Sequence, residues 1–291
     1  MRFVFIGHNY ETASMHMRGV SITNALNKQG IEAHYTINEK IKTVKVDKST
    51  VCVFIKVVWP DTLARVKAAG ARLVYDIIDN WTWSNLNHPF DYVIASNEAH
   101  KAHIESLVGK KKRVVIIPHL HTNPTRKRKT INNLNTVGYI GMDKQFAMTN
   151  EAIDYCKKAG LKWFQAAGGD AKCVERDTMM LDLGLVYAAP EMGQYGLKYD
   201  YVVKYKPATK LTNLFSYGIP ALFNPTTAFL EVVAQDEELR YLVVNSKEEI
   251  YKKIWELKND PKKLRFLSDH CFALAEKYHM DHAREYYTKL T

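Results

Sequence analysis

The stretch at residues 204–220, K-Y-K-P-A-T-K-L-T-N-L-F-S-Y-G-I-P, contains a helix whose end is clearly marked. Three apolar residues recur at helical spacing and are expected to face a core: Leu211, Leu214 and Phe215. Gly218 suits a left-handed helix cap, and Pro220 prevents the helix from continuing. Because a strand-like run at 199–203 comes first, the sequence predicts a strand, a loop and a helix in succession.

Polar residues gather at the expected start of this helix. Lys206, Thr209 and Lys210 lie before it or within its first turn, and Asn213 follows Lys210 by about one turn. The free backbone N–H groups and the dipole at a helix start favour phosphate, and lysines add positive charge. We therefore predict an anion and ribose site, with Lys204 as the alternative to Lys206. An ordinary α/β turn with surface lysines is the competing interpretation.

The same stretch resembles the donor-binding segment of GT-B glycosyltransferases. In that family the pattern K-L-x-E-h-x-x-x-G-x-P, with h apolar, follows a strand of the second Rossmann-like domain. Four positions match: Lys210, Leu211, Gly218 and Pro220. Asn213 stands where these enzymes usually carry a glutamate that grips the nucleotide ribose, and its amide can bond a hydroxyl but lacks the charge. The related E-x7-E version is absent, because Tyr205 occupies its first glutamate position.

Strands and helices alternate along the chain, which favours parallel, doubly wound sheets. In the first half, strands are expected at 2–6, 31–37, 51–58, 72–78, 91–95 and 113–118. In the second half, they are expected at 137–140, 162–167, 185–188, 199–203 and 221–223. Between 119 and 135 the pattern breaks at Pro124 and the basic run 126–129, which suits an exposed connection. We predict an α/β fold with domains at 1–125 and 136–270.

This order of elements also resembles the GT-B architecture, and the resemblance covers essentially the whole chain. It implies two Rossmann-like, doubly wound domains facing each other across a cleft, with the acceptor on the first and the donor on the second. Residues 271–291 would form a terminal helix that packs back on the first domain. The donor would be a UDP- or GDP-linked sugar, which is a substrate, so no cofactor is expected.

Composition bounds the class of protein. The chain has 291 residues and 46% hydrophobic content, enough for a sizeable core. We expect no transmembrane segment, because no run of about eighteen apolar residues occurs. The apolar start at residues 1–7 is expected to be a first strand rather than a signal peptide. Four scattered cysteines without a C-x-x-C pair indicate reduced thiols and a cytoplasmic protein.

Positive charge is concentrated in the first part of the chain. Residues 1–130 hold 20 Lys and Arg against 10 Asp and Glu, whereas residues 131–291 hold 21 of each. This asymmetry predicts an anionic partner for the first domain: nucleic acid, an acidic membrane surface or a phosphorylated polymer. Solubility charge without a partner is the competing interpretation.

Sugar transfer needs stabilisation of the departing nucleotide diphosphate. In the GT-B family, basic side chains and helix N-termini usually supply it, rather than a metal. The donor-binding candidates are two glycine turns and the helix-start residues: Gly7, Gly141, Lys206, Thr209, Lys210 and Asn213. No D-x-D motif occurs where a metal-dependent transferase needs it, so we predict no metal. His119 and His121 are spaced like a metal pair, but they have no third ligand at a readable spacing.

Asp79 is the candidate general base. It lies just past a predicted strand end, at the sheet edge where parallel α/β proteins bind ligands, and a carboxylate there can take a hydroxyl proton. The competing roles are a helix cap or a structural partner for Trp81. Asp76 is a weaker candidate because it is expected within the strand. An enzyme that retains anomeric configuration need not use such a base.

His8 and Arg18 are the acceptor-binding candidates. His8 follows the Gly7 turn, and Arg18 lies early in the first predicted helix, where it can bind an anionic acceptor. The competing interpretations are an exposed loop histidine and a solvated helix face. Trp59, Trp81 and Trp83 lie near strand ends and either stack on a sugar or base or pack in the core.

We conclude from the sequence that the chain is a metal-independent glycosyltransferase with a nucleotide-sugar donor and an anionic acceptor. The acceptor is either a cell-surface or lipid-linked glycan, with peripheral membrane contact, or a modified DNA base such as hydroxymethylcytosine. Viral DNA-base glucosyltransferases share the GT-B fold and need a positive groove for duplex phosphates. Two alternatives are a nucleotide-sugar epimerase, whose expected carboxylate constellation is not evident, and a non-catalytic nucleic-acid-binding protein.

Overall fold

The computed structural model describes the chain except for residues 80–81, 142–148, 167–172 and 188–203. The chain forms two compact units. Unit 1 comprises Met1–Leu120, Tyr205–Pro207 and Met280–Thr291, and unit 2 comprises His121–Lys204 and Ala208–His279. The chain therefore crosses between the units four times, and the short segment Tyr205–Pro207 belongs to unit 1 although it lies just before the helix quoted first.

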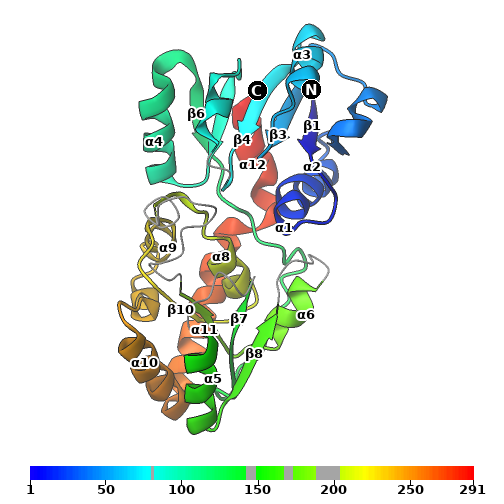
Figure 1. Ribbon diagram of the computed structural model, residues 1–291. Coiled ribbons are helices and arrows are strands. Elements are labelled where there is room, and N and C mark those ends of the chain that lie inside the picture. Colours follow the sequence, from blue (N-terminus) through cyan, green and yellow to red (C-terminus); the bar gives the residue numbers. More distant parts are fainter. Residues whose placement is uncertain (80–81, 142–148, 167–172, 188–203) are drawn as a thin grey trace. The chain divides into compact units, whose positions relative to one another are not determined.

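Unit 1 is built on a six-stranded sheet in which every neighbouring pair is parallel (Figure 1). Its strands are β1 (Arg2–Gly7), β2 (Ala33–Ile37), β3 (Thr50–Ile55), β4 (Arg72–Asp76), β5 (Tyr92–Ala95) and β6 (Arg113–Ile116). The strand order is β2-β1-β3-β4-β5-β6, and Phe3 is in register with both Ala33 and Val51. Its helices are α1 (Ala13–Met15), α2 (Ile22–Lys28), α3 (Pro60–Ala68), α4 (Glu98–Val108) and α12 (Ala283–Tyr287).

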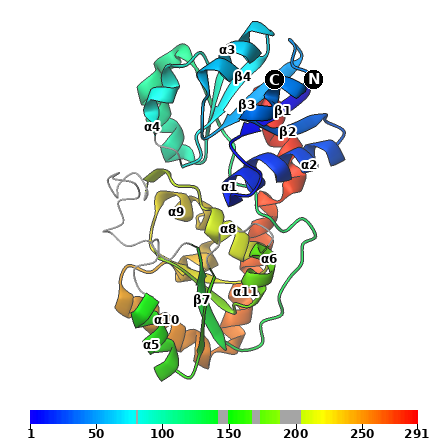
Figure 2. The same ribbon diagram turned by 45° about the vertical axis from the view of Figure 1, so that its right-hand side comes forward.

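Both faces of this sheet are covered, which explains the nearly continuous apolar runs of β1 and β3. One core contains side chains of α1, α2 and α12, and the other contains side chains of α3 and α4. The helix α12 lies beside α2 (Figure 2). Its Tyr287 meets Phe3 and Phe5 edge-on, with ring centroids 6.1 and 5.4 Å apart, respectively.

Unit 2 is built on a four-stranded parallel sheet with the order β10-β9-β7-β8. Its strands are β7 (Thr136–Ile140), β8 (Lys162–Ala166), β9 (Leu183–Val186) and β10 (Ala221–Phe223). Its helices are α5 (Thr149–Lys158), α6 (Val174–Met179), α8 (Thr209–Ser216), α9 (Thr227–Val233), α10 (Lys247–Asn259) and α11 (Pro261–Ala275). The strand predicted at 199–203 lies outside the described residues. The prediction of an α/β protein with two doubly wound parallel sheets is confirmed.

The helix α8 is the one quoted at the outset. Its predicted apolar face, Leu211, Leu214 and Phe215, is buried. Gly218 has φ 71° and donates its N–H to Phe215 O at 2.8 Å, while Ile219 N–H bonds Leu214 O at 3.0 Å. These two bonds form the Schellman arrangement, which satisfies carbonyls at the helix end. The predicted cap is therefore confirmed.

Two predicted strands end earlier than expected. The run at 51–58 stops at Ile55 because Lys56 takes a left-handed backbone conformation, with φ 62°. The run at 72–78 stops at Asp76, and Ile78 is likewise left-handed, with φ 55°. Apolar composition alone does not reveal such breaks, since isoleucine and lysine rarely adopt this conformation.

The basic run 126–129 is exposed at its first three residues, as expected from the sequence, but its charges are paired. Each member pairs with a carboxylate of unit 2: Arg126 with Glu276, Lys127 with Glu175, Arg128 with Asp269 and Lys129 with Asp182. By unit, Lys and Arg exceed Asp and Glu by 7 in unit 1 and by 3 in unit 2. The charge asymmetry is therefore weaker than the sequence halves indicate.

Candidate functional site

The strand order of unit 1 places a ligand-binding position at a specific edge. β1 has β2 on one side and β3 on the other, so the crossover direction reverses between β1 and β3. In open α/β sheets, ligands bind outside the carboxyl ends of the strands at such a switch point. His8 follows β1 there, and Lys56 follows β3. Asp79 comes soon after β4, the next strand along the sheet.

Lys56 is held in its left-handed conformation by neighbouring groups. Its N–H donates to Asp76 O at 2.9 Å. Its carbonyl accepts from the Tyr75 hydroxyl at 3.1 Å, and Asn85 Nδ2 in turn donates to that hydroxyl at 3.0 Å. Left-handed conformations of bulky residues are costly and persist where surrounding structure enforces them, often at functional sites. Ile78, directly before Asp79, is a second such residue.

Lys56 and Asp79 form an ion pair, with Nζ and Oδ1 2.5 Å apart. Both side chains are about a quarter accessible, at 21% and 27%, although the paired oxygen Asp79 Oδ1 is itself buried. The structure thus gives Asp79 a charged partner. Sequence reasoning missed Lys56, although a lysine inside the otherwise apolar run 51–58 was an available signal.

Lys206 adds a third charge to this group. The sequence places Lys206 with the donor site of the second domain, whereas the structure places it in unit 1. Burial lowers its pKa, Asp79 raises it and Lys56 lowers it further, so the three charges interact. The adjacent Tyr205 is fixed to unit 1: its carbonyl accepts from Ser96 Oγ at 3.1 Å, and its ring stacks on His103 at 4.6 Å. We refer to Lys56, Asp79 and Lys206 as the carboxylate cluster.

Lys56 also lowers the pKa values of two histidines. His8 is exposed, and its pKa is lowered by partial desolvation and by Lys56. His119 is buried, and its pKa is lowered well below the usual value by burial, Arg18 and Lys56. Its Nδ1 has no hydrogen-bond partner among the described residues. The pKa shifts of both histidines favour their neutral forms.

Arg18 is neither at the surface nor on a solvated helix face. It is 2% exposed, on the π-helical turn His16–Ser21. Its Nε donates to Asp76 Oδ2 at 2.8 Å, and its Nη1 donates to the carbonyls of Ile117 and Pro118 at 3.2 and 2.9 Å. The expectation that Arg18 presents its charge to an acceptor is corrected, because this guanidinium ties the ends of β4 and β6 together instead. Asp76, its partner, lies in β4 as predicted, but as its last residue, because the strand ends two residues earlier than expected.

Unit 2 has a corresponding switch point between β7 and β9, and Gly141 follows β7 there. Lys210, in the first turn of α8, donates from Nζ to the Tyr139 hydroxyl at 2.8 Å and lies 4.9 Å from the centre of that ring. A Cβ at Gly141 would collide with the Tyr139 hydroxyl and come within 2.9 Å of Lys210 Cε. Glycine is therefore required for this close approach. We refer to Gly141, Tyr139 and Lys210 as the lysine turn.

Thr209 and Asn213 accompany the lysine turn on α8. Thr209 is the first residue of α8, and its carbonyl accepts from Asn213 Nδ2 at 2.8 Å. Asn213 Oδ1 accepts from both the N–H and the hydroxyl of Thr122, at 2.9 and 2.8 Å. The predicted ribose contact of Asn213 thus meets a competing use, because its amide fastens the segment around Thr122 to α8.

The two edges offer different chemistry. The carboxylate cluster supplies a carboxylate that is paired with Lys56 and interacts electrostatically with Lys206, and such a carboxylate can position a hydroxyl and receive its proton. The lysine turn supplies a cation beside a helix N-terminus and a glycine turn, which can bind a phosphate. In the part of the chain that the structure describes, no group of three or more His, Cys, Asp and Glu is placed to hold a metal ion. Nor is any helix there both long and apolar enough to cross a bilayer.

Comparison with known proteins gives structural likenesses only. No family model matches the sequence, and no curated protein matches it. Sucrose-phosphate synthase from Thermosynechococcus elongatus is similar with a TM-score of 0.65 at 10% identity, over 100% of this chain and 98% of that one. An alpha-glucosyltransferase in complex with UDP and a 13-mer DNA containing an HMU base gives 0.61 at 10% identity, over 99% and 98% of the two chains.

TarM gives a TM-score of 0.60 at 14% identity, over 87% of this chain and 56% of TarM, so the chain spans little more than half of TarM's length. At such identities the likeness is one of fold. With its two parallel Rossmann-like sheets, the chain has the α/β fold of the GT-B glycosyltransferases.

Proposed function

We propose that this protein transfers a sugar from a nucleotide-sugar donor to an acceptor hydroxyl. The observation that carries the proposal is the lysine turn, in which Lys210 sits over Gly141 at the switch point of unit 2. The arrangement suits a diphosphate, and the fold is shared with a sucrose-phosphate synthase and an alpha-glucosyltransferase. These likenesses support the proposal without identifying a substrate.

The donor contacts follow from the geometry of unit 2. Lys210 and the N–H groups of the first turn of α8, which begins at Thr209, would bind the diphosphate as it leaves. We propose that these groups, rather than a metal ion, meet the developing charge. The nucleotide is UDP or GDP in this proposal, and UDP is the nucleotide named with the DNA-bound alpha-glucosyltransferase. With Asn213 engaged by Thr122, the ribose would rely on other groups or displace that contact.

The acceptor chemistry is assigned to the carboxylate cluster of unit 1. During transfer the bond between the anomeric carbon and the diphosphate oxygen breaks, a bond to the acceptor oxygen forms, and the hydroxyl proton must leave. Asp79 Oδ1 is engaged by Lys56, and no other hydrogen bond to Asp79 occurs among the described residues, so Oδ2 is the oxygen available for that proton. Lys56 is then a positioning residue, since it fixes the carboxylate without touching the reacting atoms.

The acceptor we propose is anionic, because unit 1 carries an excess of positive charge. Two acceptors fit: a surface or lipid-linked glycan, and a modified base in duplex DNA. Among the similar structures, WaaG is described as a glycosyltransferase involved in lipopolysaccharide biosynthesis, and the alpha-glucosyltransferase is bound to DNA. Those descriptions hold for those proteins, and for this chain they supply the two acceptors to test.

The test is nucleotide release from a panel of UDP- and GDP-sugars. Release is measured once with EDTA, which removes metal ions, and once with added Mg²⁺. Each donor is offered with plain duplex DNA, duplex DNA containing hydroxymethylcytosine, and lipid-linked glycan. Release that rises with one acceptor and yields a glycoside supports the proposal and identifies the acceptor. No release with any donor would contradict it.

Matched variants connect the activity to the residues. Lys210→Ala removes the proposed phosphate contact, whereas Lys204→Ala removes a nearby exposed lysine outside the lysine turn. Release lost in the first variant and kept in the second supports the assigned donor site. Equal loss in both would contradict that site even if the protein transfers sugar.

A further inference from the structure

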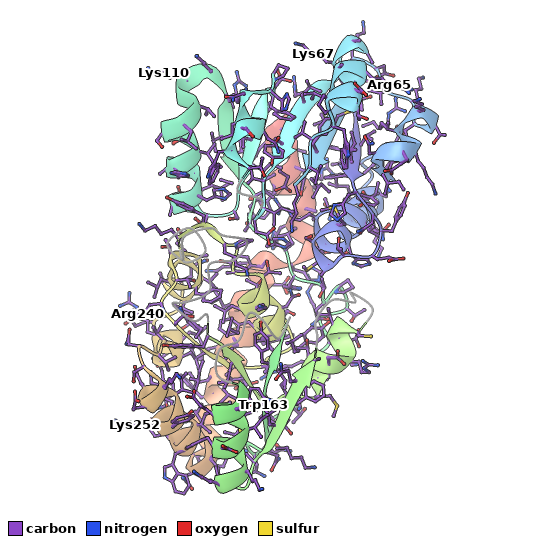
Figure 3. The ribbon with its side chains drawn as sticks, in the orientation of Figure 1. Arg65, Lys67, Lys110, Trp163, Arg240 and Lys252 are labelled. Carbon is purple, nitrogen blue, oxygen red and sulfur yellow. The ribbon has the colours of Figure 1, made fainter. Side chains whose placement is uncertain are left out.

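Unit 1 carries a group of exposed cations away from the carboxylate cluster. Six belong to the 3-10 turn Asn38–Thr43, the loop that follows it, and α3. Lys40 lies over the ring of Tyr10, and the other five are Lys42, Lys45, Lys48, Arg65 and Lys67. We call these five residues the basic patch. Figure 3 shows Arg65 and Lys67 on α3.

Contacts join the parts of the basic patch. Arg65 Nη2 donates to the carbonyl of Lys42 at 3.3 Å, which ties α3 to the 3-10 turn. At the other end of α3, a Cβ placed on Gly70 would lie 3.6 Å from Lys48 Cβ. In the connecting loop, Val44 and Val46 pack against the core, whereas Lys45 between them is exposed. The alternation of apolar and basic residues therefore holds the lysines on the outside of an anchored segment.

The charges of the basic patch are not neutralised. None of the five makes an ion pair with any described residue, whereas all four cations of the run 126–129 do. Asp47, the carboxylate within the loop, is already engaged by Arg2 at 3.2 Å and by the Ser49 N–H and hydroxyl. The five residues therefore form a region of exposed positive charge that no carboxylate of the described residues neutralises.

The position of the basic patch also separates it from the candidate site. Lys48 lies before β3, and Lys67 lies in the last turn of α3 before β4, so both are at the edge where the strands begin. The carboxylate cluster lies at the opposite edge, where the strands end. Lys48 and Lys67 are therefore separated from the carboxylate cluster, so they can hold the protein against a surface while an acceptor occupies that cluster.

We propose that the basic patch docks this protein on an anionic lipid bilayer. Four of the five cations are lysines, whose compact charges suit a diffuse plane of headgroups more than the bidentate contacts that arginine makes. The exposed residues next to Arg65 and Lys67 are small, Ala64 and Ala68 on α3 and Ala69 at its C-cap, so a flat surface can approach this end of α3. No aromatic side chain is exposed among these residues of α3 and its neighbouring loop to stack on a nucleic-acid base. The proposed docking does not depend on whether the protein transfers a sugar.

The experiment is co-sedimentation of the full chain with vesicles of phosphatidylcholine, with and without phosphatidylglycerol. The patch variant carries Lys45→Gln, Lys48→Gln and Lys67→Gln. The control variant carries Lys28→Gln, Lys110→Gln and Lys111→Gln, which removes the same charge from exposed lysines of unit 1 that also make no ion pair with a described residue. Figure 3 shows Lys110 near the end of α4, apart from α3. All six substitutions are on exposed side chains, and equal melting temperatures would confirm that both variants fold.

We expect binding to the anionic vesicles alone. Each lysine removed from a membrane contact lowers affinity about fivefold, so the patch variant should lose on the order of a hundredfold while the control loses much less. Equal loss in the two variants would overturn the proposal, because net charge and not the basic patch would then govern binding. The proposal would also be overturned if the wild-type protein did not bind anionic vesicles. A third contradicting result would be duplex DNA that binds through the basic patch and displaces the protein from the vesicles.

Discussion

The switch-point edges of the two sheets have the same arrangement of strands but carry different charged groups: a carboxylate paired with a lysine in unit 1, and a lysine bound to a tyrosine hydroxyl in unit 2. In each unit a glycine lies at the switch point beside the first strand: Gly7 is the last residue of β1 in unit 1, and Gly141 directly follows β7 in unit 2. A side chain at Gly7 would meet Tyr35 and come within 2.7 Å of Met15 Sδ, which are packing contacts. A side chain at Gly141 would meet Tyr139 and Lys210, which are the proposed phosphate-binding groups.

The difference shows that the shared fold determines where each edge lies, whereas the residues at each edge determine its chemistry. Unit 1 pairs Asp79 with Lys56, and Lys206 interacts electrostatically with both, so its edge has a carboxylate to accept a proton. The described part of the unit 2 edge offers Lys210 and helix N–H groups, which suit an anion. Function is therefore assigned to residues of each edge and not to the fold.

Removing the carboxylate should have the largest effect. Asp79→Asn keeps the shape of the side chain but cannot take a proton, so kcat should fall by about 10²–10⁴-fold, the usual contribution of a general base. Nucleotide affinity should stay unchanged, because Lys210 is intact. Steady-state kinetics and nucleotide titration measure the two effects. Normal donor binding with full activity would remove Asp79 from the base role.

Substituting Lys210 should weaken donor binding, which Asp79→Asn is expected to leave unchanged. Lys210→Ala should raise the donor KM and lower kcat, with kcat/KM falling about 10–100-fold for the loss of a charged phosphate contact. Loss of the contact with Tyr139 should cost about 1 kcal/mol of stability at most, so the melting temperature should change little. Lys210→Arg should restore part of the activity. An enzyme that tolerates Lys210→Ala would contradict the donor assignment.

The two glycines provide a matched pair. Gly7→Ala and Gly141→Ala should each destabilise their unit by about 1–3 kcal/mol, because a Cβ has no room at either position. Gly141→Ala should also weaken nucleotide binding by moving Lys210, whereas Gly7→Ala should not. Urea denaturation and nucleotide titration check this. If both variants weakened nucleotide binding equally, the proposed division between the edges would fail.

Acid should destabilise both units through buried histidines. Burial lowers the pKa of His100 in unit 1 to about 3 and that of His121 in unit 2 to about 4. The unfolded chain takes up these protons near pH 6.5, the usual histidine value. The stabilisation is therefore complete above pH 6.5 and is lost as pH falls toward 3–4, by up to about 1.4 kcal/mol per pH unit for each histidine.

Urea denaturation between pH 7 and pH 5 measures this slope. His100→Gln should flatten it by one histidine's share, even if the variant is less stable at pH 7. An unchanged slope in that variant would show that His100 is not the titrating group.

How far the sequence predicted the structure depends on how local each signal was. The face and cap of α8 were predicted residue by residue, since Leu211, Leu214, Phe215 and Gly218 act within one helix. The two parallel sheets followed from the alternation of elements. The early strand ends did not, because the left-handed backbone of Lys56 depends on Tyr75 and Asn85 of other segments.

The candidate site was predictable only in part, for the same reason. Asp79 and Lys210 were found because they follow a strand end and begin a helix. Lys56 was missed and Arg18 misplaced, because both are defined by pairing with distant residues, Asp79 and Asp76. The ion pairs of the run 126–129 were not predicted, because partners such as Glu276 and Asp269 lie far along the chain.

Titration of UDP and GDP into wild-type protein, Asp79→Asn and Lys210→Ala tests the central claim most directly. The division between the edges predicts that one nucleotide binds wild type and Asp79→Asn equally and binds Lys210→Ala at least about tenfold more weakly, a loss of about 1.4 kcal/mol. No binding of either nucleotide to wild type, or weakening by Asp79→Asn and not by Lys210→Ala, would contradict it.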